Sequence, residues 1–318
     1  MKIVVTGGSG MVGKCIKNLE FLWPNHTFTY LNRSKNDDFS LDLTNRNAVL
    51  EYFKNNKYDF IIHLAANVGG LYKNMEKNID MFSSNIKINE NVLEASHASG
   101  INRGTFILSS CIYPSNPSKF PMDETMIHES PPHPSNEGYA YAKRMLELQC
   151  RKYNETYNRE YICLIPVNLY GPYDYYNLKD SHLIPGLMHR FHLCKLDGGT
   201  FKAYGTGKPL RQLLYAPDFA YIILKVLLDN RYNETTPLIC CPNTEYTIKD
   251  IVKSVCETMN IPFELVEWDT TKSDGCMKKT VSNKKLSNIF PELTFTELNK
   301  GLEFSYNWFI ENYSTLRK

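Results

Sequence analysis

Long apolar runs are missing from this chain. No run reaches the about 18 consecutive apolar residues that cross a bilayer as a helix, so no transmembrane segment and no membrane partner is predicted. The strand-like pattern begins at once in Met1–Thr6, which leaves no room for a signal peptide with its charged start, apolar stretch and cleavage site. A cytoplasmic protein is therefore expected.

The chain also lacks a cysteine pattern typical of disulfides and a large excess of charge of one sign. The chain has 9 cysteines, an odd number, and no Cys-x-x-Cys pair, which argues against a disulfide scaffold and fits a reducing compartment. The net charge of +2 gives no electrostatic case for a nucleic-acid partner. A length of 318 residues allows one large or two small domains with a sizeable core.

Short apolar runs alternate with helical patterns in the first half of the chain. Runs rich in Val, Ile, Phe and Leu predict strands that are buried on both faces of a sheet. These strands are Lys2–Thr6, Thr27–Leu31, Asp59–Leu64, Thr105–Ser109 and Tyr161–Pro166. The helices predicted around them are Met11–Leu22, Asn45–Asn55, Ile79–Ser99 and Tyr139–Tyr157. This alternation predicts an α/β fold with a doubly wound parallel Rossmann sheet.

The pattern changes after Asn168. Further helices are predicted at Leu183–Leu196, Ile248–Met259 and Leu298–Tyr313, with too few strands for a second parallel sheet. We therefore expect a cofactor-binding Rossmann domain over residues 1–168. A smaller mixed α/β substrate-binding domain is expected over residues 169–318, with parts of the chain crossing back. The Pro-rich connection Pro114–Pro134 is expected to be an active-site wall.

A Gly-rich turn joins the first predicted strand to the first predicted helix. Gly7, Gly10 and Gly13 have the spacing G-x-x-G-x-x-G. Such glycines allow the tight turn, the close approach of a pyrophosphate to the helix N-terminus, and close helix–strand packing. Together with the reactive residues described below, the turn predicts a dinucleotide site at which Met11 and Val12 open the helix.

The end of the second predicted strand indicates which dinucleotide binds. Arg33 stands there without a neighbouring carboxylate and can pair with a 2′-phosphate, so NADP is predicted; a simple surface cation is the alternative. Asp42 is expected near the adenine. Leu64 and Ala65 stand at the end of the next predicted strand, where the backbone should pass close to the cofactor, and His63 is expected to be structural.

Ser109 and the Tyr139-x-x-x-Lys143 motif form a set that handles protons during hydride transfer to or from a carbonyl carbon. Tyr139 and Lys143 share one face of a helix, and the Lys143 ammonium is expected to lower the Tyr139 pKa. Tyr139 would then protonate the carbonyl oxygen that Ser109 polarises, while Lys143 would bond the nicotinamide ribose. Tyr141 is expected to pack away from the site, and an ion pair between Lys143 and Glu147 is the alternative for the lysine.

A thiol adjoins this set in the run Ser109–Pro114. Plain ketone reduction has no use for Cys111, so its presence suggests that the enzyme also removes a carbon-bound proton next to the carbonyl. On its own, Cys111 would be a buried structural thiol and His182 the start of a helix.

Over nearly its whole length the chain resembles the extended short-chain dehydrogenase/reductase superfamily and, within it, the GDP-L-fucose synthase family. Beside the Gly-rich turn, the motifs that carry the resemblance are His63–Gly70, Ser109–Pro114, Asp123–His128, Tyr139–Met145, Pro166–Pro172, Ser181–Pro185, Gly205–Gly207 and Lys272–Gly275. The resemblance implies inversion of C3 and C5 of GDP-4-keto-6-deoxy-D-mannose, then NADPH-dependent reduction of C4 to give GDP-L-fucose.

The resemblance also implies individual roles. Cys111 would be the base and His182 the acid of the inversions, since thiol and imidazole titrate near neutrality. Residues implied to lie at the nicotinamide are Pro166, Asn168, Leu169, Lys143 and His182. Those implied to bind the GDP-sugar are Arg190, Tyr204, Arg211, Asp274 and Lys279, with the three cations on the diphosphate. A homodimer through Asn85–Ser99 and Tyr139–Tyr157 is expected.

The sequence departs from the family pattern at a few positions and leaves rival functions. Three residues differ from those typical of the family: Tyr204 replaces a Trp, Val167 replaces a Thr, and Tyr173 replaces a His. Ser9 stands where some relatives carry an Arg. The rivals are an epimerase-reductase for another 4-keto-6-deoxy nucleotide sugar and a non-catalytic NADP-binding sensor. No metal is expected, because His182, His189 and His192 lack a supporting carboxylate or Cys.

Overall fold

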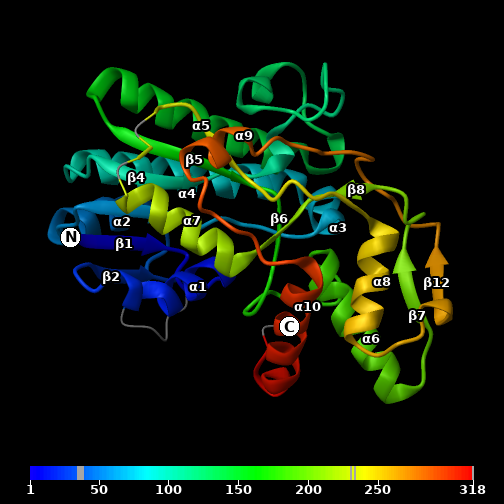
Figure 1. The fold of residues 1–318 in the computed structure, drawn as a ribbon. Helices are drawn as coiled ribbons and strands as arrows, with labels where there is room; N and C mark the ends of the chain where they lie inside the picture. The colour runs from blue at the N-terminus through cyan, green and yellow to red at the C-terminus, as the bar shows by residue number, and fades with distance from the viewer. Residues whose placement is uncertain (34–38, 230, 233, 317–318) are drawn as a thin grey trace.

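The computed structural model describes residues 1–33, 39–229, 231–232 and 234–316. A 6-stranded sheet, parallel at every pairing, forms its larger part, with strand order β10-β5-β4-β3-β1-β2 (Figure 1). The strands are β1 (Lys2–Thr6), β2 (Thr27–Leu31), β3 (Phe60–His63), β4 (Arg103–Ile107), β5 (Glu160–Pro166) and β10 (Leu238–Cys240). The chain turns from β1 to β2 on one side and then to β3 on the other. Ligands bind at such a switch point, outside the carboxyl ends of the strands.

Two layers of helices cover the sheet. Helices α2 (Arg46–Asn55), α4 (Asn78–Ala98) and α5 (Glu137–Tyr157) pack side by side, and α1 (Met11–Leu19) packs against α7 (Ala216–Leu228). Because both faces are covered, strand residues of either orientation are buried, as Val4 and Val5 are.

A smaller part packs beside the sheet, at the right of Figure 1. It contains α6 (Leu183–Asp197), α8 (Ile248–Thr258) and α10 (Leu298–Glu311), with their own apolar core. Short paired strands complete it: β6 (Asn168–Tyr170) with β9 (Leu213–Tyr215), β7 (Phe201–Tyr204) with β12 (Val266–Asp269), and β8 (Leu210–Arg211) with β11 (Tyr246–Thr247). Two short helices, α3 (Leu71–Glu76) and α9 (Lys284–Ile289), lie in connections.

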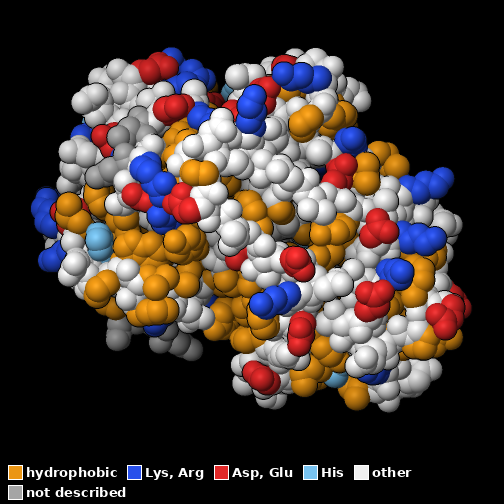
Figure 2. Space-filling view, viewed as in Figure 1, with side chains coloured by type: hydrophobic (Ala, Val, Ile, Leu, Met, Phe, Trp, Pro, Cys, Tyr) orange, Lys and Arg blue, Asp and Glu red, His pale blue; other side chains and the backbone are white. Residues whose placement is uncertain are grey.

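The predicted fold class is confirmed. Strands β1 and β2 have the bounds predicted from the sequence, and the other predicted strands are displaced by at most a few residues. Helix α7 and strand β10 were not predicted; both lie in the second half of the chain and return to the first sheet. Among the described residues, no helix combines the length and apolar character needed to span a bilayer. Figure 2 shows acidic and basic side chains interspersed over the viewed face, in keeping with the small net charge.

Candidate active site

The Gly-rich turn after β1 is too tightly packed for side chains. Gly7 has a φ of 76°, and a Cβ added there would lie 2.8 Å from the Ala65 nitrogen. A Cβ added at Gly13 would lie 2.6 Å from the Gly8 carbonyl oxygen. The turn therefore brings its backbone directly against the segment that follows β3, at the switch point of the sheet.

The N-terminus of α1 faces this turn with its backbone groups uncapped. Gly10 precedes the helix and makes no side-chain capping bond, so the N–H groups of Met11 and Val12 in the first turn have no intrahelical acceptor. Leu64 and Ala65 are fixed opposite by N–H bonds to Thr6, of 3.2 Å to its carbonyl and 3.3 Å to its hydroxyl. The arrangement is one that receives an anion at a helix N-terminus.

Arg33 and Asp42 lie near each other beyond the end of β2. Arg33 is exposed directly after the strand. The Asp42 carboxylate accepts bonds of 3.0 Å from the Thr44 N–H and 2.8 Å from the Thr44 hydroxyl. These bonds, and to a smaller degree the Arg33 charge, lower the pKa of Asp42. The Arg33 cation is thus next to a carboxylate, which the sequence had not suggested, but its guanidinium stays open to solvent.

Ser109 follows the carboxyl end of β4, and Tyr139 and Lys143 lie in the first two turns of α5. The Lys143 Nζ donates a 2.6 Å bond to the Ile107 carbonyl and lies 5.8 Å from the Tyr139 ring centroid. Burial lowers the pKa of Lys143 to about 8, while the Cys111 charge acts in the opposite direction. Burial also raises the pKa of Tyr139, contrary to the effect expected from Lys143 alone. Tyr139 thus holds its proton, as a proton donor must.

His63 ends β3, and both of its ring nitrogens form hydrogen bonds. Its Nδ1 is 2.8 Å from the Thr6 hydroxyl, and its Nε2 is 3.2 Å from the Asn89 side-chain oxygen. Burial and then the Lys143 charge lower its pKa to about 3. A neutral imidazole that is bonded on both sides suits the structural role predicted for it.

Cys111 lies in the 3-10 turn Ser110–Ile112, next to the end of β4. Its backbone N–H donates a 3.4 Å bond to the Ser109 hydroxyl, and the residue is only 7% exposed. Burial raises the pKa of the thiol. The charge of Lys279, a bond to Ser109 and the charge of Lys143 act against this rise, in that order. Two cations from distant parts of the chain therefore favour the thiolate form of one cysteine.

His182 is exposed at the start of α6, and a glycine holds the loop before it. The Gly70 N–H donates a 2.9 Å bond to the Asp180 carbonyl, and a Cβ added at Gly70 would overlap the Ser181 carbonyl oxygen. Enclosure by surrounding protein, and then the Lys73 charge, lower the His182 pKa. Among the described residues no hydrogen bond joins His182 to Cys111.

Arg190 and Tyr204 form a stacked pair in the smaller part. The Arg190 guanidinium lies 4.4 Å from the Tyr204 ring centroid, and the Tyr72 ring meets Tyr204 edge-on at 6.2 Å. Arg190 Nε is buried and has no hydrogen-bond partner within the described parts of the chain. A buried donor without an acceptor is suited to an anionic ligand.

Arg211 links Asp274 and Lys279, and of these three residues Lys279 is the one that acts on Cys111. Both carboxylate oxygens of Asp274 accept 2.7 Å bonds from Thr206, and Arg211 bonds the Asp274 carbonyl at 3.4 Å. The Lys279 pKa is lowered by burial and by the Arg211 charge and raised by the Cys111 charge. Lys279 is therefore placed between the thiol and a second cation.

The residues implied for the nicotinamide lie at the same edge of the sheet. Pro166 ends β5 and is buried. Asn168 and Leu169 begin β6, which pairs with β9; Asn168 is exposed and Leu169 is half-buried. Since β5 adjoins β4 in the sheet, these residues lie at the edge at which Ser109 follows β4.

The Pro114–Pro134 connection lies against the segment that carries Lys279. The Met122 N–H donates a 2.9 Å bond to the Thr280 carbonyl, and the Met122 carbonyl accepts a 2.8 Å bond from Ser282. This contact agrees with the expected active-site wall. Sequence reasoning overlooked His133 at the end of the same loop and Lys73 beside His182; a histidine just ahead of the Tyr139 helix was the available signal for the first.

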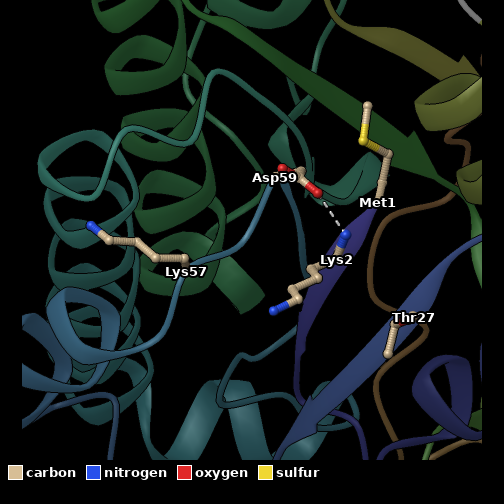
Figure 3. Close-up of a pocket in the computed structure, with 5 residues that line it drawn as sticks. All are labelled: Met1, Lys2, Thr27, Lys57 and Asp59. Carbon is tan, nitrogen blue, oxygen red and sulfur yellow. Dashed lines mark hydrogen bonds between the residues drawn. The ribbon is translucent and has the colours of Figure 1, made fainter.

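A surface hollow elsewhere is lined by Met1, Lys2, Thr27, Lys57 and Asp59 (Figure 3). Figure 3 shows the Lys2 N–H bonded to the Asp59 carboxylate, at 2.7 Å. The hollow lies at the amino ends of β1 and β2, opposite the edge that holds Ser109 and the Gly-rich turn. It has no part in the candidate site.

Comparison with known proteins identifies the family. The model of the NAD dependent epimerase/dehydratase family matches residues 3–237. The chain belongs to this family. A GDP-L-fucose synthase of Dictyostelium discoideum is 43% identical over 99% of this chain and 97% of that protein. A probable GDP-L-fucose synthase of Drosophila melanogaster is 41% identical over 100% and 99%. Within the family, the chain thus belongs to the branch that contains the GDP-L-fucose synthases.

Solved structures of the family agree with the fold. A GDP-L-fucose synthetase from Naegleria fowleri is 33% identical, with a TM-score of 0.88 over 100% of this chain and 95% of that one. A second structure of the Naegleria protein, 32% identical with the same TM-score over 100% and 96%, is bound to NADP. The resemblance stated from the sequence motifs is therefore confirmed.

Proposed function

We propose that this protein is a GDP-L-fucose synthase that converts GDP-4-keto-6-deoxy-D-mannose to GDP-L-fucose. The observation that carries the proposal is the thiol of Cys111, set beside Ser109 and under the charges of Lys279 and Lys143, at the same strand edge as Tyr139. A ketoreductase alone needs Ser109, Tyr139 and Lys143. A base beside them adds the capacity to invert carbons next to the ketone.

The first step is inversion at C3 and C5. The ketone at C4 acidifies the hydrogens on both neighbours, and the Cys111 thiolate takes one such proton while the electron pair moves onto the ketone oxygen as an enolate. His182 returns a proton to the opposite face of that carbon, which inverts it. Lys279 and Lys143 favour the thiolate at the start, since their charges oppose the effect of burial on the Cys111 pKa.

The second step is reduction at C4. NADPH, when bound, supplies the hydride. Tyr139 gives its phenolic proton to the C4 oxygen, and the Ser109 hydroxyl donates to that oxygen and orients it. Lys143, tied to the Ile107 carbonyl, bonds the nicotinamide ribose and supports the phenolate that forms on Tyr139.

The cofactor site fits a dinucleotide phosphate. Gly7, Gly10 and Gly13 admit the pyrophosphate to the uncapped start of α1. Further residues in contact with NADP are Met11, Val12, Arg33, Asp42, Leu64, Ala65, Lys143, Pro166, Asn168, Leu169 and His182. Residues 1–168 form the NADP-binding domain. Residues 169–318 form the GDP-sugar domain, apart from segments such as α7 and β10 that cross back to the first sheet. In this domain Arg190, Arg211 and Lys279 bind the diphosphate, and Tyr204 and Asp274 contact the rest of the GDP-sugar.

The enzyme is proposed to be a cytoplasmic homodimer that pairs through α4 and α5. Ile79 on α4 is 71% exposed and Tyr157 on α5 is 51% exposed, although both are large and apolar. Burial of such side chains against a second copy would stabilise the pair. A monomer mass in light scattering at working concentration would overturn this assignment.

The decisive experiment is NADPH oxidation with GDP-4-keto-6-deoxy-D-mannose, followed at the cofactor absorbance, with products resolved by NMR. We expect GDP-L-fucose. If the product is a reduced 6-deoxy sugar without inversion at C3 and C5, the reductase roles of Ser109, Tyr139 and Lys143 stand, and the roles of Cys111 and His182 are wrong. No oxidation would reject the substrate and direct attention to the 4-keto-6-deoxy sugars of UDP and dTDP, or to a non-catalytic NADP sensor.

Replacing Arg33 with Ala is expected to raise the KM for NADPH about tenfold or more, because one charge-assisted bond to the 2′-phosphate is lost. The KM for NADH, which has no 2′-phosphate, should stay unchanged and serves as the internal control. Steady-state kinetics with both cofactors measure this. Equal losses with NADH and NADPH would show that Arg33 does not contact the phosphate.

Replacing Gly70 with Ala is expected to slow C3/C5 proton exchange about 100-fold, because the new Cβ must displace the Ser181 carbonyl and with it His182. The NADP affinity should fall much less than the exchange rate, since the Gly-rich turn that receives the pyrophosphate is elsewhere and only the His182 contact with the cofactor is displaced. The matched control is Gly199→Ala, where the nearest atom to a new Cβ is the Cys194 sulfur at an ordinary 3.5 Å. Exchange at the wild-type rate in the Gly70 variant would contradict the positioning of His182.

A further inference from the structure

His133 lies at the start of the turn that leads into α5, and the proposed reaction gives it no role. It is half-buried and precedes the 3-10 turn Pro134–Asn136, which continues directly into α5. Its Nδ1 accepts a 3.2 Å bond from the Ser135 backbone N–H and lies 2.8 Å from the Ser135 hydroxyl. The ring is therefore fixed in place by its own turn.

The bond to Ser135 decides which nitrogen carries the proton. A backbone N–H can only donate, so Nδ1 must be the acceptor and the neutral ring carries its hydrogen on Nε2. Burial, followed by the charges of Lys279 and Arg211, lowers the His133 pKa and keeps the ring neutral. His133 thus offers one directed N–H, and the hydrogen bonds among the described residues leave that Nε2 unused.

The surroundings of this N–H suit an anion. Lys279 and Arg211 both act on the His133 ring, and Lys279 acts also on Cys111. Arg211 has the carboxylates of Asp274 and Glu245 in its vicinity, whereas the groups that act on Lys279 are Cys111, Arg211 and Cys276, with no carboxylate among them. Two cations and a neutral donor therefore lie near one another, and one of the cations, Lys279, also acts on the reactive thiol.

We propose that the Nε2–H of His133 donates a hydrogen bond to the β-phosphate of the GDP-sugar, between Arg211 and Lys279. The inference rests on the proposed function and adds a binding and positioning residue to it. Since the turn after His133 leads into α5, the contact ties the phosphate next to the sugar to the helix that carries Tyr139 and Lys143. The contact thereby positions the sugar ring relative to both Cys111 and Tyr139.

The test compares two variants that separate the ligand contact from the turn. In His133→Asn, the side-chain oxygen can replace Nδ1 as acceptor for Ser135, while the Nε2–H is lost. In His133→Gln, the amide NH2 can reach the position of Nε2, while the cap is lost. GDP and GMP binding are measured by calorimetry, beside the KM and kcat for the GDP-sugar, NADPH binding and the melting temperature.

His133→Asn is expected to weaken GDP binding about threefold to tenfold, the loss of one hydrogen bond, and to raise the KM more than it lowers kcat. GMP, which has no β-phosphate, should bind both proteins alike, and NADPH binding and melting should be unchanged. His133→Gln should recover most of the GDP affinity and melt at a lower temperature.

The opposite pattern would overturn the proposal. If His133→Asn binds GDP with wild-type affinity, His133 only caps its turn. The same conclusion holds if both variants lose GDP affinity only in proportion to their loss of melting temperature. An equal loss for GMP would reject the β-phosphate as the acceptor. These failures differ from failure of the proposed function, in which the wild-type protein itself would neither bind GDP nor turn over the GDP-sugar.

Discussion

Replacement of Cys111 by Ser is expected to reduce proton exchange at C3 and C5 by about 100-fold or more, the size of a lost general base. A serine hydroxyl holds its proton far more strongly than a thiol, so the charges of Lys279 and Lys143 cannot bring it to the anionic form near neutral pH. The change removes only the basicity, because Ser fits the space of Cys in the turn beside Ser109.

Deuterium uptake from solvent into the GDP-sugar, followed by NMR without NADPH, measures this exchange separately from reduction. NADP binding should be intact in the variant, since Cys111 lies away from the Gly-rich turn. Cys256→Ser is the matched control: this thiol is also buried, but it belongs to α8 and to the other apolar core. If Cys111→Ser exchanges at the wild-type rate, another group is the base.

The first half of the fold could be predicted because its signals are local. Apart from Lys2, the runs that form β1 and β2 consist of apolar, aromatic or β-branched residues, and a glycine turn or polar residues follow them, so their bounds were predicted without displacement. The Gly7–Gly13 spacing then indicated which ends of the strands would meet. These features do not depend on the rest of the chain.

The missed elements depend on distant partners. The run that forms α7 is apolar on most sides, as expected for a helix packed against both α1 and the sheet, so a helical period hardly emerges. Strand β10 has 3 residues, and only its pairing with β5 makes it a strand. The paired strands β8 and β11 have 2 residues each, too few to carry any period.

In the candidate site, too, the residues of local motifs could be predicted from the sequence, whereas contacts between distant residues could not. Ser109, Cys111, Tyr139 and Lys143 belong to two short motifs, from which the sequence predicted them as a set. The sequence could not place the Lys279 charge beside the Cys111 thiol, since 168 positions separate them along the chain. Nor could it indicate that Gly70 is needed where the Ser181 carbonyl passes, because that contact exists only in the folded molecule.

Replacement of Tyr139 by Phe is expected to reduce NADPH oxidation by about 100-fold or more while C3/C5 exchange continues in part. Phe fills the same half-buried space but has no proton to give to the C4 oxygen, so the hydride cannot be accepted there. Exchange depends on Cys111 and His182, which the change does not touch. The two steps should therefore separate in one protein.

Tyr141→Phe is the matched control for this variant, because it removes the same hydroxyl from a side chain of the same helix. The Tyr141 ring contacts Arg144, whose guanidinium carbon lies 5.5 Å from the ring centroid, and a tyrosine two places along a helix faces away from Tyr139. We expect wild-type reduction from Tyr141→Phe and deuterated but unreduced GDP-sugar from Tyr139→Phe. Normal NADPH consumption by Tyr139→Phe would exclude Tyr139 as the donor, and simultaneous loss of exchange would show that the phenol also serves the inversions by stabilising the enolate oxygen.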